Sequence, residues 1–200
     1  EKDTVAITYF NSKNDTIKSF STTANEEKDK LKDLKEGNNL FLWNMRGDGA
    51  EQLPSMILWW ANLNAPKAVP GTYQVSLTKN GKEVGRESFA IKADPRSEAT
   101  KQQMQAQFDF ITDVNKTVDR AHKSIKKIRK INDQLSAFEK QYKDDEKTKE
   151  LIDKAKELQK QFSEIEKALY QTKNRSNQDP LNFPIKLTNK LGHLNSLVGM

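Results

Sequence analysis

The sequence predicts an α+β protein in two parts, with an antiparallel β-domain over residues 1–95 and a long antiparallel helical hairpin or three-helix bundle over residues 96–200. Two observations predict this division. A turn at Pro70-Gly71 leads into a strand of strictly alternating side chains. Beyond Pro95, which lacks a backbone donor and disfavours helix at the residue before it, the hydrophobic period changes from two to 3.6 residues.

The strand that follows Pro70-Gly71 is the clearest β signal. Proline presets φ, and Gly71 permits the positive φ of a type II turn. Asn80-Gly81 then predicts a two-residue hairpin, because a type I′ turn needs positive φ at both central residues. A second strand over residues 83–91 pairs back antiparallel. Alternation places three apolar side chains of the first strand in the core: Tyr73, Val75 and Leu77.

Three further strands are expected in the first half. Residues 5–10 and 16–21 are separated by a turn cluster and predict a hairpin. Residues 40–45 resume as a strand, with Phe41 and Trp43 on its inward face. The charged stretch 22–38 between them is expected to be a loop or one or two helical turns with little burial.

The most apolar run of the chain, residues 56–60, is expected to be a buried strand bounded by Pro54 and a turn cluster at 62–66. Trp59 and Trp60 are adjacent, so they cannot both face one side of a strand. One of them is therefore expected on the surface or against the helical half. Packing is the favoured role for this pair, and an aromatic platform that binds carbohydrate is the alternative.

The second half is predicted to be helical. Thr100 and Gln103 form a capping-box pair, so the first helix is expected to begin there and to continue to the polar cluster at residues 143–145. The second helix carries an apolar seam at steps of four and three: Leu151, Ala155, Leu158, Phe162, Ile165 and Leu169. A third helix is expected to start at Pro184 and to fill the open side of the hairpin with Leu187, Leu191, Leu194 and Val198.

No pattern in the sequence predicts catalysis, a metal site or a cofactor. The chain has no cysteine and two histidines, His122 and His193, which are expected at the surface or in a helix seam. None of its eight glycines opens a helix at a phosphate-binding spacing. The carboxylates are interleaved with lysines on helix faces, where solvation is the ordinary role. No apolar run reaches the roughly 18 residues of a membrane span.

The formal net charge is +6, and one basic cluster dominates it. The cluster comprises Arg120, Lys123, Lys126, Lys127, Arg129 and Lys130, with no acid among them. Aromatic or amide readers of bases are absent from it, so nucleic-acid binding is not predicted. A solvated face is favoured, and an anionic partner is the alternative. The Arg46-Gly47-Asp48 tripeptide is interpreted as a loop rather than as an adhesion motif.

Five segments together resemble the C-terminal region of bacterial sortilin-like (BNR-repeat) β-propeller proteins, which are often labelled glycosyl hydrolases. These segments are residues 39–46, 69–75, 92–96, 105–108 and 179–187. The resemblance implies that the first half is an Ig-like β-sandwich of about seven strands, similar to a domain of the flagellar hook-capping protein. The insertion at 22–38 and the run at 56–60 depart from the family pattern.

The resemblance also implies a function and a location. It implies export of the parent protein to the periplasm, the cell surface or the medium. Together with the lack of a convergent catalytic pattern, it predicts a non-catalytic structural or interaction module of that larger protein. The expected partner is the upstream propeller of the parent protein, where any catalytic acids would lie. The alternative is a carbohydrate-binding or carbohydrate-active accessory domain, for which Trp59 and Trp60 are the candidate ligand surface.

Overall fold

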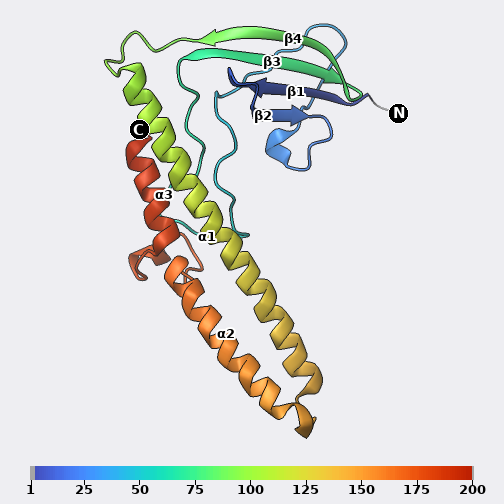
Figure 1. The fold of residues 1–200 in the computed structure, drawn as a ribbon, viewed down its shortest axis with the longest axis vertical. Helices are drawn as coiled ribbons and strands as arrows, with labels where there is room; N and C mark the ends of the chain where they lie inside the picture. Colours follow the sequence, from blue (N-terminus) through green and yellow to red (C-terminus); the bar gives the residue numbers. More distant parts are fainter. Residues whose placement is uncertain (1–2, 200) are drawn as a thin grey trace. The chain divides into compact units, whose positions relative to one another are not determined.

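The computed structural model describes residues 3–199 and contains a four-stranded antiparallel sheet followed by three α-helices (Figure 1). The strands are β1 (Val5–Phe10), β2 (Thr16–Ser21), β3 (Gly71–Lys79) and β4 (Lys82–Ile91), in the order β2-β1-β3-β4. The helices are α1 (Lys101–Tyr142), α2 (Lys149–Leu169) and α3 (Leu187–Val198). Short 3₁₀ turns lie at η1 (Glu27–Asp29), η2 (Glu146–Thr148) and η3 (Asp179–Leu181). The predicted α+β arrangement, strands first and helices second, is confirmed.

The chain forms two compact units, and neither is continuous in sequence. The first unit contains the sheet and comprises the residues up to Gly49 together with Asn64–Phe110. The second contains Ala50–Leu63 and the chain from Ile111 onward. Residues 50–63, which we call the strap, therefore leave the β half and join the helices. The division into domains of residues 1–95 and 96–200 stays a prediction.

The β3–β4 hairpin forms as its turn chemistry predicts. Asn80 and Gly81 both have positive φ, +51° and +77°. Gly71, in contrast, has no positive φ and is the first residue of β3, paired with Ile91. The expected type II turn is therefore wrong at this position, because the chain enters β3 in extended form. The Asn80 turn sets the pairing next to it, and the register shifts by one residue between Thr78 and Leu77.

One face of the sheet is aromatic, and a segment without strand pairing covers part of it. Tyr9 stacks on Trp43 with ring centroids 4.2 Å apart, and Phe20 packs on Phe41 at 4.7 Å. Phe41 and Trp43 thus point inward as expected. Residues 40–45 themselves form no strand, which corrects the prediction. Side-chain stacking holds them in place of a hydrogen-bonded ladder.

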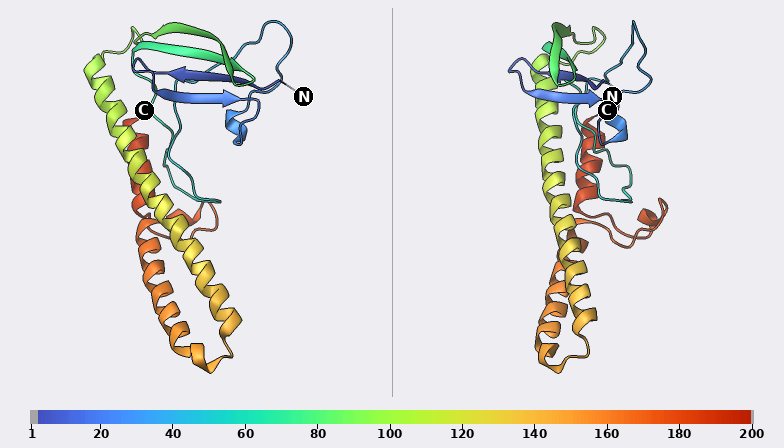
Figure 2. Two further views of the ribbon diagram at one scale, coloured as in Figure 1. Left: turned by 45° about the vertical axis from the view of Figure 1, so that its right-hand side comes forward. Right: turned by 90° about the vertical axis from the view of Figure 1, so that its right-hand side faces the viewer.

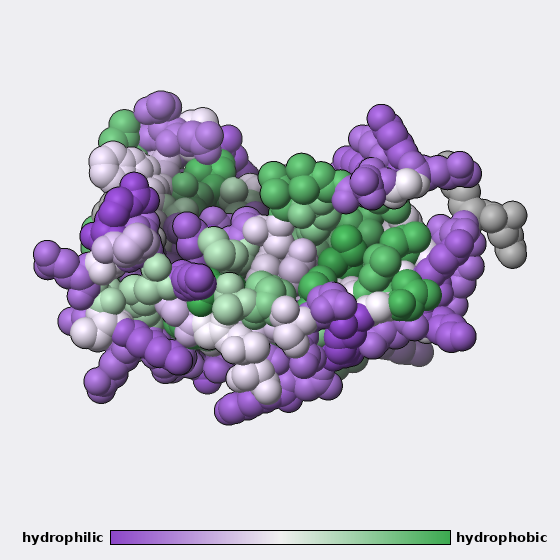
Figure 3. Space-filling model, turned by 90° about the horizontal axis from the view of Figure 1, so that it is seen from above, coloured by the Kyte–Doolittle hydropathy of each residue, from purple (hydrophilic) through white to green (hydrophobic). Residues whose placement is uncertain are grey.

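This cover is incomplete, so apolar side chains of the sheet unit reach the surface. The space-filling view shows hydrophobic side chains exposed on its right-hand side (Figure 3). Tyr73 is buried as predicted, but Leu77 is 43% exposed. Its neighbour on β4 is Gly85, which offers no side chain to pack against. The large apolar residues of this unit that are exposed are Leu34, Leu40, Leu42, Met45, Leu77, Val84 and Phe110.

The structure has four strands rather than about seven, because the expected strand at 56–60 does not form either. Those residues belong to the strap and carry no strand pairing. Their backbone bonds go to Leu53 within the strap, to the Tyr170 hydroxyl and to side chains of α3. A sheet partner is therefore not needed to satisfy them.

The start of α1 and its end follow the sequence prediction. The Thr100 N–H donates to Gln103 Oε1 at 2.8 Å, and the Gln103 N–H donates to Thr100 Oγ1 at 3.2 Å. This reciprocal pair is the predicted capping box. The helix then runs unbroken to Tyr142, next to the polar cluster at 143–145. The third helix begins at Leu187, three residues later than predicted.

The helix α2 is rotated relative to its predicted seam. It runs antiparallel to α1 (Figures 1 and 2), and three polar contacts fix its orientation. Gln159 Nε2 donates to the Asn132 carbonyl at 3.0 Å, and Arg129 Nε donates to Glu166 Oε1 at 2.8 Å. Lys156 pairs with Glu139. With this rotation Ile152 and Ala155 are buried, whereas half of the expected seam is exposed: Leu151, Leu158 and Ile165.

Replacing Tyr73 by Ala is expected to lower the free energy of unfolding by about 3–5 kcal/mol, because it removes a buried aromatic side chain and leaves a cavity. Leu77→Ala, in the same strand and on the same face, is the matched control, with an expected loss below about 1 kcal/mol because its side chain is largely exposed. Urea unfolding of both variants measures the difference. Equal losses of stability in the two variants would contradict the burial of Tyr73 and the exposure of Leu77.

Candidate functional site

The candidate ligand residues, Trp59 and Trp60, lie in the strap on the helical unit. Their indole rings meet edge to face with centroids 6.4 Å apart. Trp60 is 75% exposed and Trp59 is 37% exposed. Trp60 has a φ of +49°, a left-handed conformation that is costly for a bulky side chain. The structure thus brings both indoles to one place at the surface.

Helix α3 holds the strap at these tryptophans through polar side chains. Asn189 Oδ1 accepts from the Trp59 N–H at 2.7 Å, while Asn189 Nδ2 donates to the Trp59 carbonyl at 2.8 Å. Ser196 Oγ donates to the Trp60 carbonyl at 3.1 Å. The Asn62 N–H donates to the Gly192 carbonyl at 2.9 Å. These bonds satisfy backbone groups of the strap that a neighbouring strand would satisfy in a sheet.

The inward face of α3 is consequently polar, whereas the sequence pattern predicted an apolar one. Its buried residues are Thr188, Asn189, Gly192 and Asn195. Asn195 Nδ2 donates to Asn115 Oδ1 of α1 at 3.0 Å. Leu187 and Leu194, which were expected to be buried, are exposed instead. The strap and α1 need hydrogen-bonding partners, so the polar edge of α3 turns toward them.

The beginning of the strap is held by α1 and by the residue after α2. The Glu51 N–H donates to Asp119 Oδ1 at 2.6 Å, and the Ile57 N–H donates to the Tyr170 hydroxyl at 2.8 Å. Strap side chains also enter the core of the helical unit, where Leu53 packs with Ile125 and Tyr170. The strap is therefore an integral layer of this unit.

His122 of α1 is fully buried beneath the strap. Its Nδ1 lies 2.5 Å from the Glu51 carbonyl oxygen, which can only accept, so Nδ1 carries the proton. Nε2 has no hydrogen-bond partner among the described residues. Burial lowers the pKa of His122, and the Glu51 carbonyl and the Asp119 carboxylate only partly offset this. The lowered pKa favours the neutral ring, and the side chain is enclosed by the protein.

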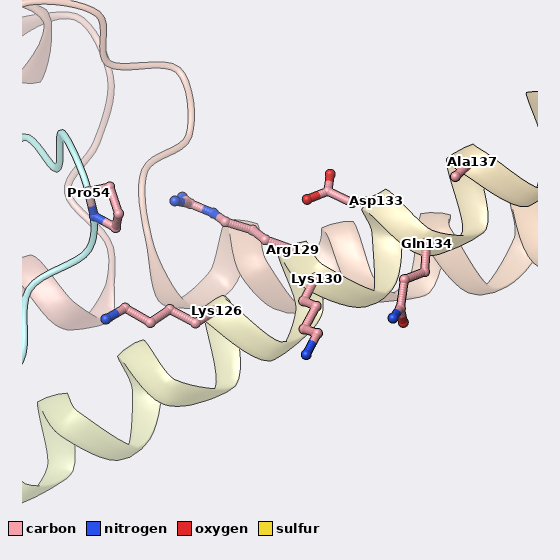
Figure 4. Close-up of a pocket in the computed structure, with 7 residues that line it drawn as sticks. All are labelled: Pro54, Lys126, Arg129, Lys130, Asp133, Gln134 and Ala137. Carbon is pink, nitrogen blue, oxygen red and sulfur yellow. The ribbon is translucent and has the colours of Figure 1, made fainter.

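A shallow groove of about 530 Å³ runs along α1 beside Pro54 and carries part of the basic cluster (Figure 4). Its lining residues are Pro54, Lys126, Arg129, Lys130, Asp133, Gln134 and Ala137. Lys126 is paired with Glu51, and Arg129 with Glu166. Those two charges hold the strap and α2, so they are already compensated. The groove offers less positive potential than the sequence cluster indicates.

The Arg46-Gly47-Asp48 tripeptide is used inside the sheet unit. Arg46 donates to the Ala65 carbonyl, and Asp48 pairs with Lys18. Lys18 is itself buried and also pairs with Asp29 at 2.6 Å. Burial opposes the charge on Lys18, but its bonds to Asp29 and Asp48 outweigh this and raise its pKa. These contacts favour a structural role for the loop.

Within residues 3–199, no group of three or more His, Asp or Glu side chains is placed to hold a metal ion. No helix in that range is long and apolar enough to cross a membrane. Comparison with family models, with curated proteins and with solved structures found no match. The resemblance to sortilin-like propeller proteins therefore stays a hypothesis.

Gly192 of α3 packs closely against the strap, and its replacement tests how tightly the two pack. A Cβ at this position would lie 2.8 Å from Ala61 Cβ and 3.1 Å from Leu63 Cδ2. Gly192→Ala is therefore expected to cost about 1–3 kcal/mol through overpacking. Gly85→Ala is the control, because nothing lies within 4 Å of its Cβ. Thermal unfolding compares them, and a neutral Gly192→Ala would contradict the packing.

Stability is expected to fall in mildly acidic solution because of His122. Its pKa is lowered in the folded state, so the unfolded chain binds the proton more readily. The loss should begin as the pH falls through the unfolded value of about 6.5 and level off below the folded one. Urea midpoints between pH 8 and 5 measure it. His122→Gln should flatten this profile, and an unchanged profile in this variant would contradict the role given to His122.

Proposed function

We propose that this chain is a non-catalytic structural or interaction module from the C-terminal part of a larger exported protein. The main observation behind the proposal is that several buried polar side chains form hydrogen bonds within the chain itself. Asn189, Tyr170 and His122 are all bonded to the backbone of the strap. They are therefore occupied in holding two segments of the chain together.

The resemblance described above supports the finer part of the proposal. It implies a parent with an upstream β-propeller, which is the proposed partner, and a location in the periplasm, at the cell surface or in the medium. In this view residues 1–95 are an Ig-like sandwich whose second layer is supplied by the segment that carries Phe41 and Trp43. Residues 96–200 are the helical hairpin or bundle that accompanies it.

The alternative is a carbohydrate-binding module, and one observation favours it. Trp60 is largely exposed despite a costly left-handed backbone conformation. Strain of this kind at an exposed aromatic residue is frequent at ligand-binding positions. The perpendicular indole of Trp59 would add an edge against which a sugar ring could rest.

The two proposals separate in one experiment on the purified chain. A panel of oligo- and polysaccharides is added while sugar release and tryptophan fluorescence are followed. The module proposal predicts neither turnover nor saturable quenching, and turnover would overturn it. Quenching that is lost in Trp60→Gly but kept in Trp43→Phe would establish the carbohydrate module instead. Glycine suits the positive φ of residue 60, so this variant should keep its fold.

The proposed parent is tested separately by the sequence that precedes residue 1 in the natural protein. Propeller repeats there would support the accessory-module proposal. A flagellar or unrelated context would contradict the parentage. It would leave the non-catalytic assignment to be judged by the carbohydrate experiment alone.

A further inference from the structure

The turn between β3 and β4 contains Asn80-Gly81, the one asparagine of the sequence that is followed by glycine. Both residues are exposed. The backbone nitrogen of the residue after an asparagine can attack the side-chain amide of that asparagine, and glycine obstructs this attack least because it has no Cβ. A Cβ at Gly81 would meet nothing within 4 Å, so the rest of the protein leaves the turn open as well.

The Gly81 nitrogen is free to act as the attacking atom. In the β3–β4 ladder Lys79 pairs directly with Lys82, so the two turn residues lie outside the ladder. Within residues 3–199 the Gly81 N–H donates no hydrogen bond. Loss of its proton to the solvent therefore breaks no hydrogen bond of the fold.

The Asn80 side-chain carbonyl is polarised by Thr4, the residue before β1. Asn80 Oδ1 accepts from the Thr4 N–H at 2.8 Å and from the Thr4 hydroxyl at 3.3 Å. Attack on Cγ places negative charge on this oxygen, and donors already directed at it stabilise that charge. Asn80 Nδ2, the leaving atom, donates to Asp3 Oδ1 at 2.8 Å. The bonds that hold residues 3 and 4 to the turn thus also activate the amide.

We propose that Asn80 is a site of spontaneous deamidation in the folded protein. The Gly81 nitrogen gives its proton to the solvent and forms a bond to Asn80 Cγ. The Cγ–Nδ2 bond breaks, and Nδ2 leaves as ammonia after it takes up a proton from the solvent. Water then opens the resulting cyclic imide at one of its two carbonyls, which leaves aspartate or isoaspartate at position 80. Water is the one co-reactant, and nothing is oxidised or reduced.

Either product disturbs the contact between the start of β1 and the turn. The pKa of the Asp3 carboxyl is lowered by its bonds to Lys79 and Asn80, so Asp3 is ionised in neutral solution. A carboxylate oxygen in place of Nδ2 would bring a like charge to Asp3 and remove a donor. The exposed Lys79–Asp3 pair offsets little of this. Isoaspartate also lengthens the backbone of a turn whose positive φ angles at Asn80 and Gly81 set the pairing next to it.

The consequence for the fold is measured on variants of the full chain. Asn80→Asp reproduces one product and is expected to lower the thermal unfolding temperature. Asp3→Asn in the same chain should restore much of the loss, because it removes the like charge. An Asn80→Asp chain as stable as the parent would overturn the proposed consequence.

Mass spectrometry of the full chain tests the modification itself. After incubation in mildly alkaline buffer the folded protein is expected to gain about 1 Da, with the change at Asn80 and isoaspartate among the products. The gain should be faster at higher pH, because the Gly81 nitrogen must lose its proton. Asn11, which precedes Ser12, is the internal control and should stay unchanged. Reaction at Asn11 before Asn80 would overturn the proposal.

The chain unfolded in urea gives the rate of the same Asn-Gly pair without its bonds to Thr4. An Asn80 that stays intact in the folded chain while it reacts in urea would overturn the proposal. Thr4→Val keeps the shape of the side chain but removes the hydroxyl donor, so it should slow the reaction of the folded chain several-fold. Thr8→Val, in β1 at a hydroxyl bonded to Ser19, is the matched control and should react at the parent rate. Equal rates in the two variants would overturn the activation by Thr4.

Discussion

The backbone of the strap needs hydrogen-bond partners, and this requirement determines which side chains of the helical unit face it. Residues 50–63 lie against helices without a strand partner, so their backbone N–H and C=O groups must find partners outside a sheet. Some of these are backbone groups, as the Gly192 carbonyl is for the Asn62 N–H, and others are side chains. Asp119, Tyr170 and Asn189 supply those partners, and Gly192 provides the close approach. A buried group left unpaired would cost about 1–3 kcal/mol, comparable to a sizeable part of the stability of a small domain. The polar inward face of α3 follows from this demand.

The features that the sequence predicted well are those decided within a few residues. The Asn80-Gly81 turn, the capping box of Thr100 and Gln103, and the end of α1 at Tyr142 all depend on local backbone chemistry. Tyr73 was placed correctly because a clean alternation surrounds it. The burial of Leu77 was predicted wrongly for the opposite reason. It depends on the neighbouring residue of β4, Gly85, and the alternation within β3 contains no information about that residue.

The strap was the largest error because an apolar run has no period that distinguishes a strand from a packed coil. The adjacent tryptophans did contain a usable signal. The inference that one of them lies on the surface or against the helical half agrees with Trp60 at the surface and Trp59 bonded to α3. What the sequence could not provide was the partner, since Asn189 is 130 residues away in the chain.

The α2 helix shows how polar contacts choose between two apolar faces. Its leucines and isoleucines follow steps of four and three along a broad stripe, so either edge of that stripe could face α1. Gln159 and Glu166 determine which edge faces α1, because their bonds to α1 form with the Ile152 edge turned inward. The opposite edge is thereby left in water.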